Sequence, residues 1–214
     1  MRGAPGGTAA TLTDGPELLA VTPDRLRGAL GHFASGVTVV TTATEGPDGS
    51  EGRPQAHGMT ANAFTSVSLE PPLVLVSIAN GARTHRRIDA SGRYGVSILG
   101  AEQEAAARHF AGAEQSPEVV GLEWRDGLPL VTGALVHLVC RVRQAHRAGD
   151  HTLFVGEVEG LWIGSGGPLV HYRRDLRALP GTTAANPGAH PGANPPAAHR
   201  DLGTDREERP AHAR

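Results

Sequence analysis

The sequence predicts a mainly β fold, a closed or nearly closed antiparallel barrel with a few peripheral helices. β-branched and apolar runs recur along residues 37–172, and short connections rich in Gly, Pro and polar residues join most of them. Few helical segments separate these runs, so the chain lacks the regular strand–helix alternation of a doubly wound sheet. No Gly-x-Gly-x-x-Gly follows a predicted strand, which argues against a dinucleotide fold of that type. An antiparallel barrel agrees with all of these observations.

The globular pattern runs from residue 22 to residue 179. Residues 1–21 are rich in Gly, Ala and Thr, and they lack both sustained periodicity and the basic start and apolar stretch of a secretory signal. Residues 180–214 consist mostly of Pro, Ala, Gly and charged residues with almost nothing to bury. We therefore predict a flexible N-terminal segment over 1–21, one domain over 22–179 and a disordered tail over 180–214.

The domain is expected to begin with a helix. Thr22-Pro23-Asp24 combines an N-cap hydroxyl, a proline at the first helical position and an acid near the positive end of the helix dipole. Leu26, Leu30 and Phe33 then fall on one face, and Gly36 is expected to end the helix. Two further short helices are predicted over 82–90 and 101–110.

The strands carry most of the remaining chain. Residues 37–44 (VTVVTTAT) are dominated by β-branched residues and predict a strand. Residues 57–79 (HGMTANAFTSVSLEPPLVLVSIA) are expected to form two strands separated by a turn at Glu70-Pro71, and residues 116–130, which include Trp124, to form an irregular excursion packed against the barrel. Further strands are predicted over 94–99, 133–143, 152–163 and 169–172.

Composition excludes several classes of function. The net charge is −2, without a basic stripe carrying aromatic residues, so no nucleic-acid partner is expected. No segment approaches the ~18 consecutive apolar residues of a membrane span. Cys140 is the only cysteine, so a disulfide framework and a thiolate zinc site are excluded and a cytoplasmic protein is favoured. We expect Cys140 to be buried. All 20 Lys and Arg residues are arginine, so any phosphate must be held by arginine, hydroxyls or backbone N–H groups.

Small hydrogen-bonding side chains concentrate in residues 57–79. Thr60, Asn62 and several serines alternate with Gly and Ala, so a planar ligand could approach the main chain closely. Arg83 and Thr84 follow at the start of a predicted helix, an arrangement that suits an anion. The alternative is that Thr and Ser simply occupy solvent-facing strand positions, which is common, and the residue pattern leaves both interpretations open.

One further pair of side chains invites an acid–base interpretation. Asp150 and His151 are adjacent, but neighbouring strand residues point to opposite faces, so we expect them to make a poor acid–base pair. His57 is expected to be structural, at the mouth of a pocket. No metal site is predicted.

Seven motifs, in their order along the chain, closely resemble the short-chain flavin reductase family. Members of this family are the small reductase components of two-component flavin-dependent monooxygenases. Each motif alone is weak, but the ordered set covers nearly all of residues 22–179. The motifs are SGVTVVTT (35–42), HGMTANAFTSVSLEPPLVLVSIA (57–79), RYGVSIL (93–99), FAG (110–112), GLPLVTGALVHLVC (127–140), GDHTLFVGEV (149–158) and PLVHYRRDLRAL (168–179).

The resemblance implies a fold and an activity. The fold would be an antiparallel split β-barrel of the Greek-key, FMN-binding type, usually a homodimer. The enzyme would use NADH or NADPH to transfer hydride to FMN or FAD and would supply the reduced flavin to a partner oxygenase. Two other functions stay open: a non-catalytic flavin carrier or sensor, and an oxidoreductase that keeps its flavin and acts directly on an organic substrate.

The resemblance also implies which positions form the site. The flavin would border residues 36–38 and 59–62, with its phosphate end near Ser77, Asn80, Arg83 and Thr84. His151, the candidate catalytic residue, would face the nicotinamide pocket, with Tyr172 and Arg173 nearby. The full predicted cofactor-binding set is Gly36, Val37, Thr38, Met59, Thr60, Ala61, Asn62, Ser66, Ser77, Asn80, Arg83, Thr84, Tyr172 and Arg173.

Two positions depart from the family pattern. Ala63 and Ala82 stand where the family often has serine. Each missing hydroxyl removes a possible hydrogen bond worth roughly 1 kcal/mol, so the choice between FMN and FAD stays open.

Overall fold

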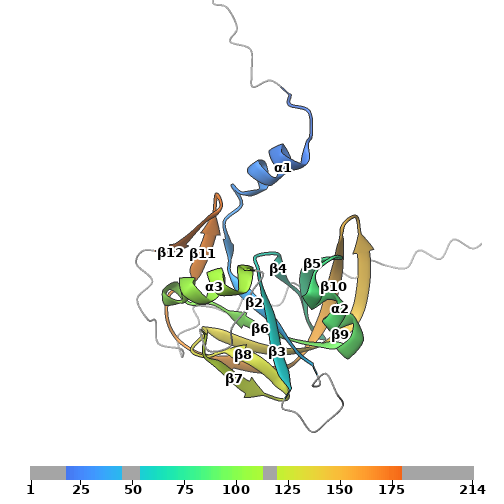
Figure 1. The fold of residues 1–214 in the computed structure, drawn as a ribbon, viewed down its shortest axis with the longest axis vertical. Helices are drawn as coiled ribbons and strands as arrows, with labels where there is room; N and C mark the ends of the chain where they lie inside the picture. Colours follow the sequence, from blue (N-terminus) through green and yellow to red (C-terminus); the bar gives the residue numbers. More distant parts are fainter. Residues whose placement is uncertain (1–17, 45–53, 113–119, 180–214) are drawn as a thin grey trace, which may run out of the picture.

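The computed structural model describes residues 18–44, 54–112 and 120–179 (Figure 1). Most of the predicted N-terminal segment and the whole predicted tail lie outside these ranges, so the domain boundaries stay predictions. The described residues form four helical elements: α1 (Pro23–Leu30), α2 (Arg83–Ser91), the 3-10 turn η1 (Ala101–Gln103) and α3 (Glu104–Ala111). The strands are β1 (Ser35–Gly36), β2 (Thr38–Thr44), β3 (Gln55–Ala61), β4 (Phe64–Leu69), β5 (Pro72–Ala79), β6 (Arg93–Ile98), β7 (Leu122–Arg125), β8 (Leu128–Val131), β9 (Val136–Ala148), β10 (His151–Ile163), β11 (Leu169–Tyr172) and β12 (Asp175–Ala178).

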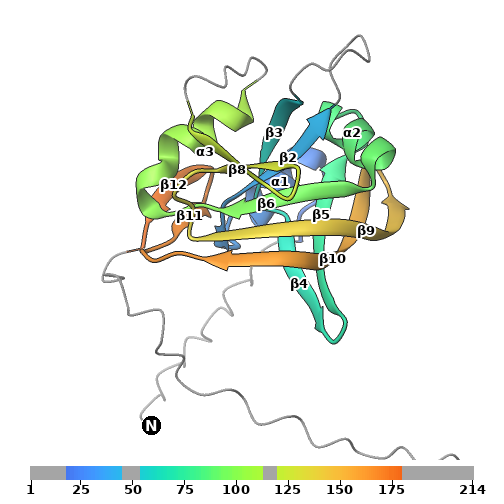
Figure 2. The same cartoon turned by 90° about the horizontal axis from the view of Figure 1, so that it is seen from below.

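Antiparallel sheets form the body of the molecule, as predicted. Seven strands pair in the order β3-β2-β6-β9-β10-β5-β4, and two small sheets, β1-β11-β12 and β7-β8, adjoin them. Figure 2 shows β9 and β10 crossing the molecule side by side, with the β4–β5 hairpin projecting beyond them. The helices lie at the periphery, which confirms the predicted fold class.

Strand β2 is buried on both faces, which explains its uninterrupted β-branched sequence. Val40 belongs to the main core. Tyr94 of β6, Phe154 of β10 and Ile88 of α2 are fully buried in this core. Val39, on the opposite face of β2, belongs to a second core under α3. Since strand side chains alternate between faces, one valine run contributes to two cores.

The predicted two-strand reading of residues 57–79 is wrong, because the segment forms three strands. The chain turns at Glu70-Pro71 as expected, but it also bends at Asn62-Ala63. β3 pairs with β2 at one end of the main sheet, whereas β4 pairs with β5 at the other end. The bend therefore carries the chain from one edge of the sheet to the other.

Three smaller predictions also need correction. Helix α1 ends at Leu30 with Gly31 as its C-cap, so it does not reach Gly36. The described part of the expected excursion contains the hairpin β7–β8, whose turn at Asp126-Gly127 has φ values of 46° and 76°. Trp124 of that hairpin is 44% exposed and so does not pack fully against the barrel.

The expectation that Cys140 is buried is confirmed. Cys140 is fully buried in the main core. Within the three described ranges, no helix is both long and apolar enough to cross a bilayer.

Replacing Gly156 by alanine tests how tightly the main core is packed. A Cβ atom there would overlap the Tyr94 hydroxyl and lie 2.7 Å from Tyr94 Cζ, and the Tyr94 ring is fully buried. We expect Gly156→Ala to lower the free energy of unfolding by about 1–3 kcal/mol in urea denaturation. Gly81→Ala is the matched control, since its Cβ would meet nothing within 4 Å. Equal free energies of unfolding for the two variants would contradict the close contact between Gly156 and the Tyr94 ring.

His57 provides a pH-dependent test of the fold. Burial, with the positive charges of Arg87 and Arg83, lowers the pKa of His57 from 6.5 to about 4. Between these two values the unfolded chain binds a proton at His57 that the folded chain does not, so stability falls as the pH decreases.

We expect His57→Gln to lose less stability than the wild type between about pH 7 and about pH 5 in urea denaturation. His146→Gln, which removes an exposed histidine of β9, should keep the wild-type pH dependence. An NMR titration that found His57 protonating near its ordinary pKa would refute this account.

Candidate functional site

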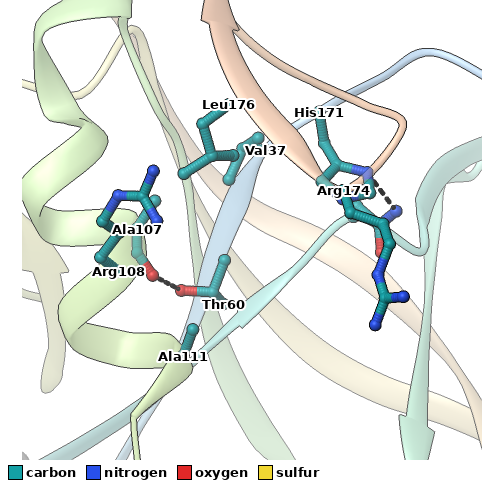
Figure 3. A pocket seen from close by; sticks show the side chains of 9 residues that line it. Val37, Thr60, Ala107, Arg108, Ala111, His171, Arg174 and Leu176 are labelled. Atoms are coloured by element: carbon teal, nitrogen blue, oxygen red, sulfur yellow. Dashed lines mark hydrogen bonds between the residues drawn. The ribbon is translucent and has the colours of Figure 1, made fainter. Parts of the chain in front are cut away.

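Two hollows adjoin one another beside the β11–β12 hairpin. The smaller, of about 270 Å³, lies between β3, α3 and this hairpin (Figure 3). The larger, of about 680 Å³, lies between α1 and the body of the molecule. They share three lining residues, Asn62, His171 and Arg174.

Small side chains form one side of the smaller hollow, along β3 and α3. Ala107 and Ala111 lie four residues apart on α3 and face it, with Val37 and Thr60 also contributing to its lining. The Thr60 hydroxyl donates to the Ala107 carbonyl at 2.6 Å, which fixes β3 against α3. Such a wall leaves room for a flat ring close to the backbone of β3.

The larger hollow contains the Asp150–His151 pair. His151 Nδ1 lies 2.7 Å from Asp150 Oδ1, so the expectation of a poor pair is wrong. β10 begins at His151, and Asp150 lies in the preceding turn, where Gly149 has a φ of 62°, so strand alternation does not separate the two side chains. The interaction with His151 holds the pKa of the exposed Asp150 carboxyl below its usual value of 3.8.

A hydrogen-bonded network joins the His151 turn to the start of α2. Asn80 Nδ2 donates to the Gly149 carbonyl at 3.3 Å, and the Thr152 hydroxyl donates to Asn80 Oδ1 at 2.8 Å. His85 Nε2 lies 2.8 Å from the same hydroxyl, whose single hydrogen is already donated, so His85 Nε2 is the donor. Asn80, predicted to lie near a phosphate, is thus held by the turn that presents His151.

The start of α2 has the chemistry of an anion site. Arg83 is exposed at the first helical position, whereas Thr84 is only 1% exposed. Ala82 occupies the N-cap and gives no side-chain hydrogen bond to the first N–H groups. Because alanine stands at position 82, where the family often has serine, the first N–H groups of α2 receive no side-chain cap from this position.

The remaining predicted residues occupy varied places. Thr38 donates its hydroxyl to the Ala61 carbonyl at 2.7 Å, and both residues are buried. Met59 packs against the main core, and the exposed Gly36 ends β1. Ser66 is exposed on the edge strand β4, and Ser77 is half-buried in β5. Of the predicted set, Val37 and Thr60 line the smaller hollow, His151 lines the larger, and Asn62 lines both.

Tyr172 and Arg173 contact the end of α1 rather than either hollow. The Arg173 N–H donates to the Gly31 carbonyl at 2.8 Å, and its guanidinium lies 3.3 Å from His32 Nε2. The Tyr172 ring meets His32 edge-on at 6.4 Å. These contacts fix the base of α1 beside the larger hollow.

Sequence reasoning missed His171 and Arg174, which line both hollows. Asn62 Nδ2 lies 3.3 Å from His171 Nδ1. Arg173 and Arg174 form a two-residue turn between β11 and β12, and their φ values are 51° and 68°. A left-handed conformation costs a non-glycine residue roughly 1–2 kcal/mol. Turns of this kind normally carry Asn-Gly, so Arg-Arg gave no sequence signal.

Comparison with known proteins places this architecture in a family. The family described as "Flavin reductase like domain" matches residues 30–180. An NADH-dependent flavin reductase of Rhodococcus sp is 57% identical over 159 residues, which are 74% of this chain and 88% of the relative. The reductase component of 4-hydroxyphenylacetate 3-monooxygenase from Thermus thermophilus is 40% identical over 157 residues, 73% of this chain and 96% of the relative.

A solved structure agrees in fold. The NADH:FAD oxidoreductase SgcE6 of Streptomyces globisporus C-1027, in complex with NAD and FAD fragments, superposes with a TM-score of 0.68 at 36% identity. The alignment covers 81% of this chain and all of that chain (100%). The sequence matches and the shared split barrel together show that the chain belongs to the flavin reductase-like family.

Proposed function

We propose that this chain is an NADH-dependent flavin reductase that transfers hydride from the nicotinamide to FMN or FAD and supplies the reduced flavin to a flavin-dependent monooxygenase. The observation that carries the proposal is the pair of adjoining hollows with a common wall. Hydride transfer requires two rings in contact, and two hollows sharing Asn62, His171 and Arg174 can place one ring against the other.

The smaller hollow fits a flavin. When bound, the flavin supplies the electron-accepting ring, and the protein supplies orientation and hydrogen bonds. The hydroxyls of Thr38 and Thr60 donate to main-chain carbonyls, so they stiffen the wall, and donors to the ring must come largely from backbone N–H groups. The start of α2, with Arg83 and Thr84, suits the phosphate end.

His151 has the chemistry to orient a nicotinamide. The Asp150 carboxylate accepts only, so the nearby His151 Nδ1 carries the hydrogen of their 2.7 Å interaction. In the neutral ring Nε2 is then an acceptor, and a carboxamide NH₂ is a donor of matching chemistry. Asp150 therefore serves to hold the His151 ring in one tautomer.

The two alternatives make different demands on the site. A flavin carrier needs no second hollow with an Asp–His pair, whereas an oxidoreductase that retains its flavin would not show saturation with added flavin. The decisive assay mixes the purified chain with NADH and free FMN, FAD or riboflavin and follows the loss of NADH absorbance. Absence of turnover with every flavin, with NADPH tested as well, would reject the proposed activity.

Removing the His151 ring should weaken nicotinamide binding. We expect His151→Ala to raise the KM for NADH roughly tenfold, with a smaller change in the KM for FMN, since it loses one hydrogen bond to the substrate. His146→Ala removes an exposed histidine of β9 and should leave both constants unchanged. Unchanged NADH kinetics in His151→Ala would remove the role assigned to this residue.

We further propose that two copies assemble through α1. In Figure 1 this helix stands apart from the barrel, and it buries none of its residues within its own chain. An eight-residue helix is marginal without tertiary packing. The flanking Leu19 and Phe33 are 60% and 76% exposed, which suits contact with a second copy.

A cytoplasmic location stays a prediction from the sequence.

Charged substitutions at the two apolar residues that flank α1 test whether two copies assemble through this helix. We expect the wild type to have the mass of a dimer in light scattering, and Leu19→Asp combined with Phe33→Asp to shift it towards the monomer, because burying carboxylates in an apolar contact is costly. Leu179→Asp, at a 48% exposed leucine outside α1, is the control and should stay dimeric. A monomeric wild type at micromolar concentration would disprove the proposal.

A further inference from the structure

Among the described residues, Arg174 stands out because its guanidinium has no protein partner. Among the residues that the structure describes, no hydrogen bond or ion pair engages its guanidinium, and the side chain is exposed. The adjacent Asp175 does not serve it, because Oδ2 of that carboxylate lies 3.0 Å from Arg177 Nε and Oδ1 accepts from the Leu176 N–H at 3.0 Å. The charge of Arg174 is therefore available to a ligand.

The other arginines in the walls of the two hollows and in this turn each have a side-chain partner. Arg27 of α1 pairs with Asp24 at 3.0 Å, and Arg108 of α3 pairs with Glu104 at 2.6 Å. Arg173, next in the same turn, contacts His32. Of the arginines in these walls and this turn, Arg174 is thus the one with an uncommitted guanidinium.

Arg174 also has a special position, because it lines both hollows. Figure 3 shows it beside His171, across the smaller hollow from Thr60 and Arg108. In the larger hollow it shares the wall with Asp150 and His151. Its φ of 68° makes it a non-glycine residue in the left-handed region, a conformation that concentrates at ligand-binding positions.

We propose that Arg174 binds a phosphoryl group of the nicotinamide dinucleotide and so positions the co-substrate in the larger hollow. This inference rests on the proposed function, which assigns the larger hollow to the nicotinamide. A guanidinium pairs with phosphate oxygens in a planar, two-pronged arrangement, and this chain has no lysine to do so. The flavin phosphate would use the separate group at the start of α2, so the two anionic ligands have different arginines.

The test compares Arg174→Gln with a variant that loses the same charge at a distance from both hollows. With saturating FMN, we expect Arg174→Gln to raise the KM for NADH roughly tenfold, to leave kcat within about twofold and to leave the KM for FMN unchanged. Arg143→Gln, at an exposed arginine of β9 outside both hollows, is the control and should keep wild-type constants. Arg174→Lys should recover part of the loss, because it restores the charge without the fork.

A second substrate identifies the group that Arg174 contacts. Reduced nicotinamide riboside carries no phosphate, so the wild type and Arg174→Gln should show the same KM for it. Arg174→Gly should raise the melting temperature by removing the left-handed strain, yet raise the KM for NADH as much as Arg174→Gln does. A more stable variant with weaker NADH binding cannot be explained by a damaged hairpin.

Calorimetric titration with NAD⁺ in the absence of flavin compares the dinucleotide affinities of the wild type and of Arg174→Gln without turnover. Weaker NAD⁺ binding by Arg174→Gln supports the inference even if flavin reduction or the role of His151 fails its own test. The inference is overturned by an unchanged affinity for the dinucleotide, by an equal loss in Arg143→Gln, by an equal loss with the phosphate-free riboside, or by a KM change confined to FMN.

Discussion

The register of β10 between β5 and β9 is the constraint on which the site depends. β10 pairs on both sides from its first residue, with His151 opposite Ala79 of β5 and Ala148 of β9. A slip of one residue would exchange the faces of the strand, so Thr152 would no longer point towards Asn80. Because this register is fixed along both edges, the turn that carries His151 and the loop that leads into α2 are held together.

This constraint also explains why the Asn80–Thr152–His85 network can form. Asn80 follows directly after β5, and Thr152 is the second residue of β10, so the ladder alone brings their side chains together. His85 approaches from the first turn of α2 and donates to the same hydroxyl. Hydrogen bonds therefore join the two ends of the proposed site, for the nicotinamide and for the flavin phosphate.

The polar residues of β2 and β3 are largely used inside the protein. Thr38, Thr41 and Thr60 donate their hydroxyls to the carbonyls of Ala61, Pro129 and Ala107, each on a neighbouring element. These bonds satisfy buried polar groups and join β2 and β3 to the elements around them. The residue pattern left open whether such hydroxyls face a ligand, and the geometry makes these threonines support the wall that a ligand would contact.

Local chemistry made much of the fold predictable. The Thr22 cap, the β-branched run of β2 and the turn at Glu70-Pro71 each depend on residues close together in sequence. The bend at Asn62-Ala63 was missed because it is determined by pairing across the sheet, where Ser77 N–H donates to the Ala63 carbonyl. The hairpin β7–β8 was missed although Asp126-Gly127 is a typical turn signal.

For the site, a motif could suggest Val37, Thr60, Asn62 and His151, but not which side chains are free to bind. Whether an arginine is free to bind a ligand depends on which acidic side chains lie close to it in space. Asp24 and Glu104 sit three and four residues before Arg27 and Arg108, so their helices neutralise those arginines locally. Asp175 follows Arg174 directly, yet the two-residue turn and the strand that follows direct its carboxylate to Arg177 instead. Within the described part of the chain, the uncompensated guanidinium of Arg174 is thus a product of hairpin geometry, and no count of charges along the sequence would reveal it.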